Sequence, residues 1–215
     1  FSHMPEDQRF IFPNPTKVEE DYANSIFLTD IGIKVFFEEL EKREYLKNSI
    51  VIIVGDHGFP LGDHGIYQSV NGYFDESFRT PFLMVWNNKL KPKVISEEAF
   101  SQVDIAPSLV DLLNLKLGKH HFQGTSFFDQ STSQNSVFLV QPYNGISLSV
   151  VQYPFKYTQN LRTKAEYFFN LKNDPGETEN LMIDSKFNPT MGKLKLKMNT
   201  IFLNQVLIQE NKIWK

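Results

Sequence analysis

The feature that most constrains the fold is an unbroken apolar run, IVIIV at residues 50–54, which ends at Gly55. The run has no alternating polar residues, which is typical of a strand buried on both faces, as in a parallel sheet. A helical pattern precedes it over residues 16–47, with five apolar side chains on one face: Tyr22, Ile26, Ile33, Phe37 and Leu40. A long helix feeding a buried strand predicts an α/β architecture.

Further elements follow along the chain. Residues 81–86 (PFLMVW) form a second apolar run that predicts a buried strand. Asp104 is placed to cap a helix that has Pro107 in its first turn. The pattern of apolar and polar residues changes near residue 126. After this point, residues 136–141 and 146–153 are predicted to be strands of a half-exposed antiparallel sheet. An amphipathic helix over residues 190–211 closes the chain.

Composition narrows the possible partners. The chain has 215 residues, 41% of them hydrophobic, and a formal net charge of −3, so it can bury a sizeable core and shows no basic stripe for nucleic acid. It has no cysteine, which excludes disulfides, thiolate metal sites and a cysteine nucleophile within these residues. No apolar run approaches the roughly 20 residues that a membrane span requires.

Two similar tetrads carry the chemistry. Asp56 and His57 directly follow the predicted strand and are flanked by glycines, in the sequence GDHG. In open α/β sheets, ligands bind beyond the carboxyl ends of strands, and a carboxylate beside an imidazole is half of a divalent-metal site. The alternative is a capped turn with a solvated aspartate and a histidine packed on the sheet.

The second tetrad, at residues 62–65, repeats the letters GDHG after a turn at Phe59 and Pro60. No strand precedes it, so it is predicted to be a loop beside the same pocket. His64 is either a pocket residue or part of a purely structural turn.

Several segments, taken in order, resemble the sulfatase branch of the alkaline phosphatase superfamily. The resemblance covers the chain from its first residues to about residue 181. It is carried by GDHG at 55–58, LGDHG at 61–65, DESFRTP at 75–81, VDIAPSL at 103–109, GTSF at 124–127 and YFFNLKNDPGETENL at 167–181.

The resemblance implies a fold class and a domain division. It implies an alkaline-phosphatase-like α/β sandwich with a mostly parallel central sheet, followed by a small antiparallel C-terminal sheet with a helix. Residues 1–125 would then be the C-terminal part of the catalytic core, and residues 126–215 a C-terminal α+β subdomain.

The resemblance also implies a metal site. The family holds one divalent cation with an early Asp-Asp pair and a later Asp-His or Asp-Asn pair, and the later pair matches Asp56 and His57. Calcium is the first expectation for the cation, with Mn, Mg or Zn as alternatives.

Two further histidines enter through the same resemblance. The family has a histidine in an H-x-P stretch before the long helix, and His3-Met4-Pro5 falls at that place, although Ser2-His3-Met4 also resembles an expression-vector remnant. His3 and His64 are therefore the candidate catalytic residues. A cation and a charged imidazole would stabilise the charge that develops on the ester oxygens.

The sequence departs from the family pattern at two points. Sulfatases usually have a lysine just before the segment at 75–81, whereas residues 68–73 (QSVNGY) contain none, which puts sulfate specificity in doubt. The family's nucleophile, a formylglycine in a C/S-x-P-x-R segment or a threonine, has no counterpart in this chain.

Three interpretations therefore remain open. The first is the C-terminal half of a metal-dependent sulfatase that acts on a small-molecule or glycan sulfate ester. The second is the same half of a phosphoglycerol or phosphoethanolamine transferase, which acts on a lipid head-group phosphodiester. The third is a non-catalytic domain that keeps the fold. Family habit implies an extracytoplasmic, secreted or lysosome-like location.

The missing nucleophile gives a first prediction. The purified 215-residue chain should not hydrolyse an aryl sulfate or a phosphodiester, because it holds no group to form the covalent intermediate. The measurement is product release over hours at high protein concentration. Turnover at rates normal for a sulfatase would contradict the prediction.

Overall fold

The computed structural model describes residues 16–68, 72–118, 122–129 and 135–210. Contacts divide the chain into two compact units, the first within residues 1–69 and 79–93, the second within residues 70–78 and 94–215. The chain therefore leaves the first unit at residue 70, returns to it at residue 79, and enters the second unit again at residue 94. The predicted boundary near residue 125 stays a prediction.

The first unit contains one long helix and one strand pair. Helix α1 (Lys17–Lys42) begins with a capping box, in which Thr16 and Glu19 each satisfy a backbone N–H of the other. A 3-10 turn, η2 (Tyr45–Lys47), leads into β1 (Ile50–Val54), which pairs with β2 (Phe82–Trp86). The predicted helix and both predicted strands are thus present.

The direction of this pairing differs from the expectation. Strands β1 and β2 are antiparallel, with Ile52 opposite Met84. A run of branched apolar residues favours a strand, but it does not encode the direction of the partner strand. The parallel arrangement expected for β1 is therefore absent from the pairs formed by the described residues, all of which are antiparallel.

The predicted burial of β1 on both faces is also wrong within the described part of the chain. Its residues are half-buried, and Val54 is exposed, because a sheet of two strands covers little of either face. Ile26, expected on the buried face of α1, is 53% exposed. Other large apolar side chains are exposed on α1 and β2: Phe27, Leu28, Ile31, Val35, Phe36, Phe82 and Leu83.

The second unit is built on a four-stranded antiparallel sheet, in the order β3-β4-β5-β6. Its strands are β3 (Val137–Gln141), β4 (Ser147–Gln152), β5 (Phe155–Asn160) and β6 (Glu166–Asn170). Strands β3 and β4 match the prediction. Strands β5 and β6 were missed, because FKYTQN and EYFFN mix polar and apolar residues without a clean period of two.

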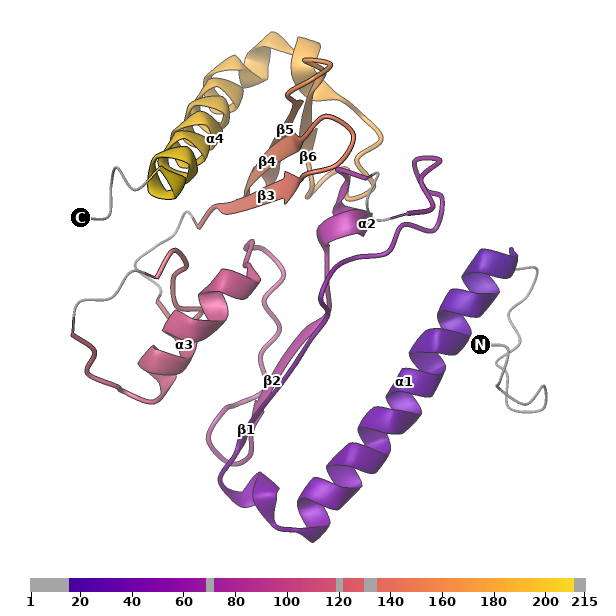
Figure 1. The fold of residues 1–215 in the computed structure, drawn as a ribbon, viewed down its shortest axis with the longest axis vertical. Coiled ribbons are helices and arrows are strands. Elements are labelled where there is room, and N and C mark those ends of the chain that lie inside the picture. Colours follow the sequence, from indigo (N-terminus) through magenta and orange to yellow (C-terminus); the bar gives the residue numbers. More distant parts are fainter. Residues whose placement is uncertain (1–15, 69–71, 119–121, 130–134, 211–215) are drawn as a thin grey trace. The chain divides into compact units, whose positions relative to one another are not determined.

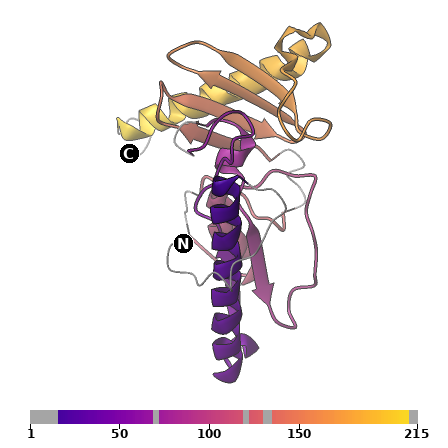
Figure 2. The same cartoon turned by 90° about the vertical axis from the view of Figure 1, so that its right-hand side faces the viewer.

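Helix α4 (Asn188–Gln209) packs along one face of this sheet, as Figures 1 and 2 show. The core between them consists of six buried side chains: Leu148, Val150, Tyr157, Phe168, Leu194 and Met198. This helix ends two residues before the predicted boundary. None of the helices in the described ranges is both long and apolar enough to cross a membrane.

Two short helices complete the second unit. Helix α2 (Asp75–Phe78) is a single turn, and α3 (Ile105–Leu112) follows the 3-10 turn η4 (Gln102–Asp104). Pro107 lies in the first turn of α3 as predicted. Two further 3-10 turns, η5 (Leu181–Ile183) and η6 (Ser185–Phe187), connect β6 to α4.

Two leucines of α4 provide a test of this packing. Leu194 is 2% exposed and Leu196 is 68% exposed. Leu194→Ala should lower the free energy of unfolding by about 2–5 kcal/mol, because it leaves a cavity against the sheet. Leu196→Ala should change it by about 0.5 kcal/mol or less. Urea denaturation measures both, and equal effects would contradict the packing of α4.

Candidate functional site

Asp56 and His57 directly follow β1, at the place the sequence predicted. The turn is fixed by Gly55, whose N–H donates to the Pro81 carbonyl at 3.1 Å. A Cβ on Gly55 would lie 3.1 Å from both Thr80 Cβ and Pro81 Cδ, so the absence of a side chain permits this approach. The GDHG and RTP segments therefore lie side by side.

The loop after His57 is held against α1. The Phe59 ring stacks on the Tyr22 ring with centroids 5.4 Å apart, and Pro60 is fully buried. Stacked rings of this kind add to the stability gained from burial. The turn that carries Asp56 and His57 is thus anchored on both sides, by β2 before it and α1 after it.

The side chains of Asp56 and His57 face each other. Asp56 Oδ2 lies 3.8 Å from His57 Nε2, and Asp56 Oδ1 accepts the backbone N–H of His57 at 2.9 Å. The two side chains are 89% and 55% exposed, respectively. One oxygen of the carboxylate thus accepts from the turn, while the other lies near Nε2, and both side chains are accessible to solvent.

The imidazole is held in one tautomer. His57 Nδ1 lies 2.7 Å from the Gly58 carbonyl oxygen, which can only accept a hydrogen bond. In the neutral imidazole, Nδ1 therefore carries the proton and Nε2 keeps its lone pair. A backbone carbonyl on the second nitrogen is the usual partner of a metal-bound histidine.

These two residues fit a divalent cation. A carboxylate oxygen and an imidazole nitrogen suit Ca, Mg, Mn or Zn, and both atoms are accessible. Within the described ranges, no group of three His, Cys, Asp or Glu side chains comes together that could hold a metal. Asp56 and His57 thus form a pair, to which a cation would need further ligands.

The second tetrad is a tight turn of its own. The Gly65 N–H donates to the Gly62 carbonyl at 2.8 Å, and both glycines have positive φ, +111° and +70°. A Cβ on Gly62 would lie 2.7 Å from the Tyr67 ring, so the turn packs directly on this aromatic. His64 is half-buried within the turn, which gives the tetrad a structural role and leaves the catalytic role of His64 a prediction.

His3, the other predicted catalytic residue, lies outside the described residues.

Two other motif segments bind each other in the second unit. The Asp104 carboxylate accepts the N–H of Ser101 at 2.7 Å and that of Thr125 at 2.8 Å. Ser108 Oγ donates to the Asp104 carbonyl and accepts the N–H of Phe127 at 2.7 Å. Asp104 was expected to cap α3, but its side chain instead joins the VDIAPSL and GTSF segments.

A buried ion cluster was not predicted from the sequence. Lys156 Nζ lies 2.8 Å from Asp75 Oδ1 and 2.8 Å from Glu177 Oε1, and its side chain is fully buried. The missed signal was a lysine between two aromatic residues, Phe155 and Tyr157, since buried lysines are almost always paired. Because two carboxylates already bind Lys156, it does not supply the charge missing from residues 68–73.

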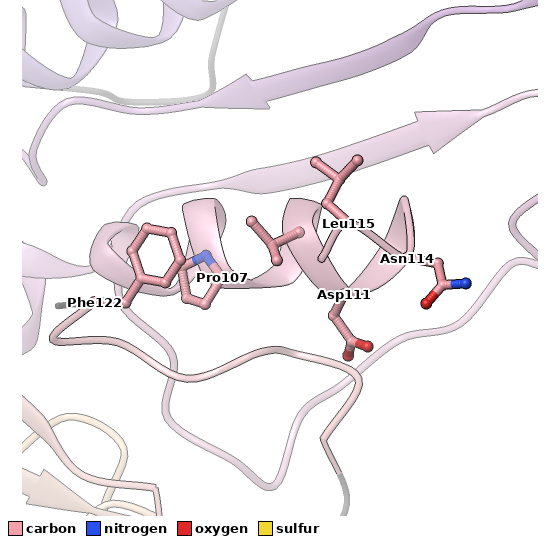
Figure 3. A pocket seen from close by; sticks show the side chains of 6 residues that line it. Pro107, Asp111, Asn114, Leu115 and Phe122 are labelled. Atoms are coloured by element: carbon pink, nitrogen blue, oxygen red, sulfur yellow. The ribbon is translucent and has the colours of Figure 1, made fainter. Parts of the chain in front are cut away.

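A hollow of about 280 Å³ lies beside α3 in the second unit. Figure 3 shows Phe122 beside Pro107, with Asp111 further along the helix and Asn114 and Leu115 just past its end. The hollow is open and falls just below the 300–1,000 Å³ of typical ligand pockets. None of the predicted site residues lines it.

Comparisons with known proteins agree with these motifs. The Sulfatase family model matches residues 2–115, and the model for the C-terminal part of N-sulphoglucosamine sulphohydrolase matches residues 62–204. The chain therefore belongs to the sulfatase family, within the alkaline phosphatase superfamily.

Curated relatives include an ulvan-active sulfatase of Formosa agariphila, 26% identical over 77% of this chain. An arylsulfatase of Clostridium perfringens is 27% identical over 88% of this chain. The matched regions are 29% and 39% of those two proteins, so the chain spans about a third of their length.

Solved structures share the fold. A structure described as a complex with its substrate D-glucosamine-2-N,6-O-disulfate has a TM-score of 0.70 at 19% identity, over 92% of this chain and 42% of that one. Phosphonate monoester hydrolase from Silicibacter pomeroyi also has a TM-score of 0.70, at 17% identity over 89% and 43% of the two chains. The predicted α/β fold class, with its C-terminal sheet and helix, is confirmed.

The contact between the two motif segments of the second unit can be tested at Gly124. A Cβ there would lie 2.3 Å from the Val103 carbonyl oxygen and 2.5 Å from Asp104 Oδ1. Gly124→Ala should destabilise the chain by about 1–3 kcal/mol, because backbone must move. Gly118→Ala is the control, since nothing lies within 4 Å of its Cβ position. Thermal unfolding compares the two, and equal melting temperatures would contradict the close approach.

Proposed function

We propose that this chain is the part of a sulfatase that supplies Asp56 and His57 to one divalent cation, in an enzyme that hydrolyses sulfate esters. The observation that carries the proposal is the pair itself, with Oδ2 and Nε2 3.8 Å apart at the end of β1. Membership of the sulfatase family supplies the reaction class.

The chain's own residues have defined tasks in this proposal. The Gly58 carbonyl keeps Nδ1 protonated, so that His57 offers Nε2 as a ligand. Asp56 offers Oδ2 and uses Oδ1 to hold the turn. When bound, the cation would stabilise negative charge on the ester oxygens as a Lewis acid. Calcium is the first choice, and Mn, Mg and Zn share the ligand preferences.

The two candidate catalytic histidines, His3 and His64, would act on the transferred group. His64 is half-buried in the turn that follows the cation pair, within seven residues of His57. His3 would contribute to the same group from the segment that precedes the long helix in the sequence. A positively charged imidazole beside the sulfate would stabilise the negative charge that develops on the sulfate oxygens in the transition state.

The substrate class proposed is a sulfated sugar. Relatives named for such substrates include a Δ4,5-hexuronate-2-O-sulfatase and an N-acetylglucosamine-6-O-sulfatase of Bacteroides thetaiotaomicron. Both matching family models are sulfatase models, which favours a sulfate ester over a lipid phosphodiester.

The test is metal content and sulfatase activity of the complete gene product. Asp56→Asn should lower the affinity for Ca²⁺, measured by calorimetry, and should reduce kcat/KM on a sulfated glucosamine by about 100-fold or more, because a ligand of the cation loses its charge. Asp63→Asn is the matched control from the second tetrad and should remain within a few-fold of wild type.

Two results would count against the proposal. Unchanged metal affinity in Asp56→Asn would remove this residue from the cation site. Normal metal binding with no activity on any sulfate ester would contradict the substrate class.

A further inference from the structure

Lys156 lies in β5, an inner strand of the C-terminal sheet, opposite Val151 of β4 and Phe169 of β6. Its neighbour Tyr157 points into the core beneath α4. Because successive side chains of a strand point to opposite faces, Lys156 points to the face away from α4. An ammonium group there has no access to water, since the residue is 0% exposed.

Two carboxylates from distant segments neutralise this ammonium. Asp75 belongs to α2, and Glu177 belongs to the turn after β6, 102 residues further along the chain. The two are also joined directly, because the Asp75 backbone N–H donates to Glu177 Oε2 at 2.5 Å. Lys156 Nζ lies 5.9 Å from the centroid of the Phe78 ring, within the range of a cation–π contact.

The same segment has other contacts with the sheet. Gln141 of β3 donates to the Gly72 carbonyl at 3.0 Å. The Tyr73 ring lies 5.0 Å from that of Tyr167, and the Phe74 ring lies 6.0 Å from that of Phe169. Residues 72–78 thus cover the face of the sheet opposite α4, with the ion cluster at their centre.

The turn that carries Glu177 is stabilised by hydrogen bonds of its own. The Asp174 carboxylate accepts the N–H of Thr178 at 3.1 Å and that of Glu179 at 2.8 Å. Glu177 itself has φ +52°, a conformation that costs energy for a residue other than glycine. The turn holds this unfavourable conformation while the Glu177 carboxylate reaches Lys156.

We propose that Lys156 is a positioning residue that docks residues 72–78 on the C-terminal sheet through Asp75 and Glu177. The docking itself depends only on the contacts of the second unit.

The charges in the cluster give the docking a characteristic pH dependence. With all three groups ionised, one ammonium faces two carboxylates, so the buried cluster has an excess negative charge. Burial raises the pKa of Glu177 above 4.5, and the Asp75 carboxylate adds to this, although Lys156 opposes it. Tyr73 and Tyr167 also face this site, and burial together with Tyr167 and Glu177 raises the pKa of Tyr73.

The direction of the pH effect follows from linkage. The docked segment buries Glu177 and brings the Asp75 carboxylate beside it, so it binds the Glu177 proton more tightly than an undocked segment would. Docking is therefore favoured as the pH falls from above the raised pKa towards 4.5, and this gain is lost as the pH rises again. A contact without a buried titrating group would show no such change.

The experiment is hydrogen–deuterium exchange of the 215-residue chain, corrected for the intrinsic effect of pH on exchange. Protection of residues 72–78 is compared with protection of β4 in the same sample. In the wild type, the ratio should rise as the pH is lowered. In Glu177→Gln, where a neutral amide replaces the carboxylate, the ratio should match the wild-type value at low pH and should not vary with pH.

Removal of the lysine is the second arm. Lys156→Met should lower the protection of residues 72–78 by about tenfold or more relative to β4, because two buried carboxylates lose their partner. Lys195→Met is the control, since Lys195 pairs with Glu166 rather than with this cluster. If Lys156→Met does not fold, Asp75→Asn, Lys156→Met and Glu177→Gln are combined, which leaves no unpaired charge.

The outcomes are distinct from those of the metal test. The combined variant should keep the protection of β4 and lose both the protection of residues 72–78 and its pH dependence. Equal changes in the segment and the sheet in every folded variant, or a wild-type ratio that does not vary with pH, would overturn the proposal. The result of the Asp56→Asn titration has no bearing on this readout.

Discussion

The second unit depends on the neutralisation of one buried ammonium. An unpaired lysine inside a sheet would cost several kcal/mol, so Lys156 is tolerated only when Asp75 and Glu177 are both in place. These carboxylates come from segments far apart in the chain, and their meeting requires the sheet, the turn at 174–180 and residues 72–78 to be formed together. If apolar side chains replaced these buried charges, the same elements could pack together, and the formation of each would depend less on the others.

The family motifs have separate physical tasks in this structure. GDHG at 55–58 exposes a carboxylate and an imidazole, and its first glycine permits contact with Thr80 and Pro81. VDIAPSL and GTSF bind each other through Asp104 and Ser108. DPGETENL carries three anchoring side chains: Asp174 holds its own turn, Glu177 reaches Lys156, and Asn180 accepts the N–H of Phe168 at 3.0 Å. Most of these motif residues therefore stabilise the fold, and few are available to contact a substrate.

Much of the secondary structure could be predicted from the sequence, because local patterns encode it. The apolar run at 50–54, the stripe along α1 and Pro107 at the start of α3 all gave elements within a few residues of their observed bounds. The pairing direction of β1 and β2 could not be predicted, since it depends on how the chain returns. Strand β5 escaped because Lys156, Thr158 and Gln159 break the apolar pattern, and only the ion cluster explains the buried lysine.

The site was predictable to a similar degree. The position of Asp56 and His57 after a strand followed from the sequence, and the structure adds the tautomer of His57, which depends on a backbone carbonyl. The glycines of the second tetrad indicated a turn, and the structure shows the hydrogen bond that closes it. Asp75 and Glu177 could not be linked to each other or to Lys156, because partners 102 residues apart leave no local signal.

The path of the chain has a consequence for modular evolution. Residues 72–78 belong to the second unit, although residues of the first unit precede and follow them in the sequence. A single crossover in the gene that exchanges the C-terminal sheet but keeps residues 79–93 with their own first unit therefore separates Lys156 and Glu177 from the Asp75 that they bind. Chimaeras joined anywhere between residues 79 and 155 would combine an ammonium from one parent with a carboxylate from the other. Only parents that share all three residues could recombine there and keep a neutralised sheet.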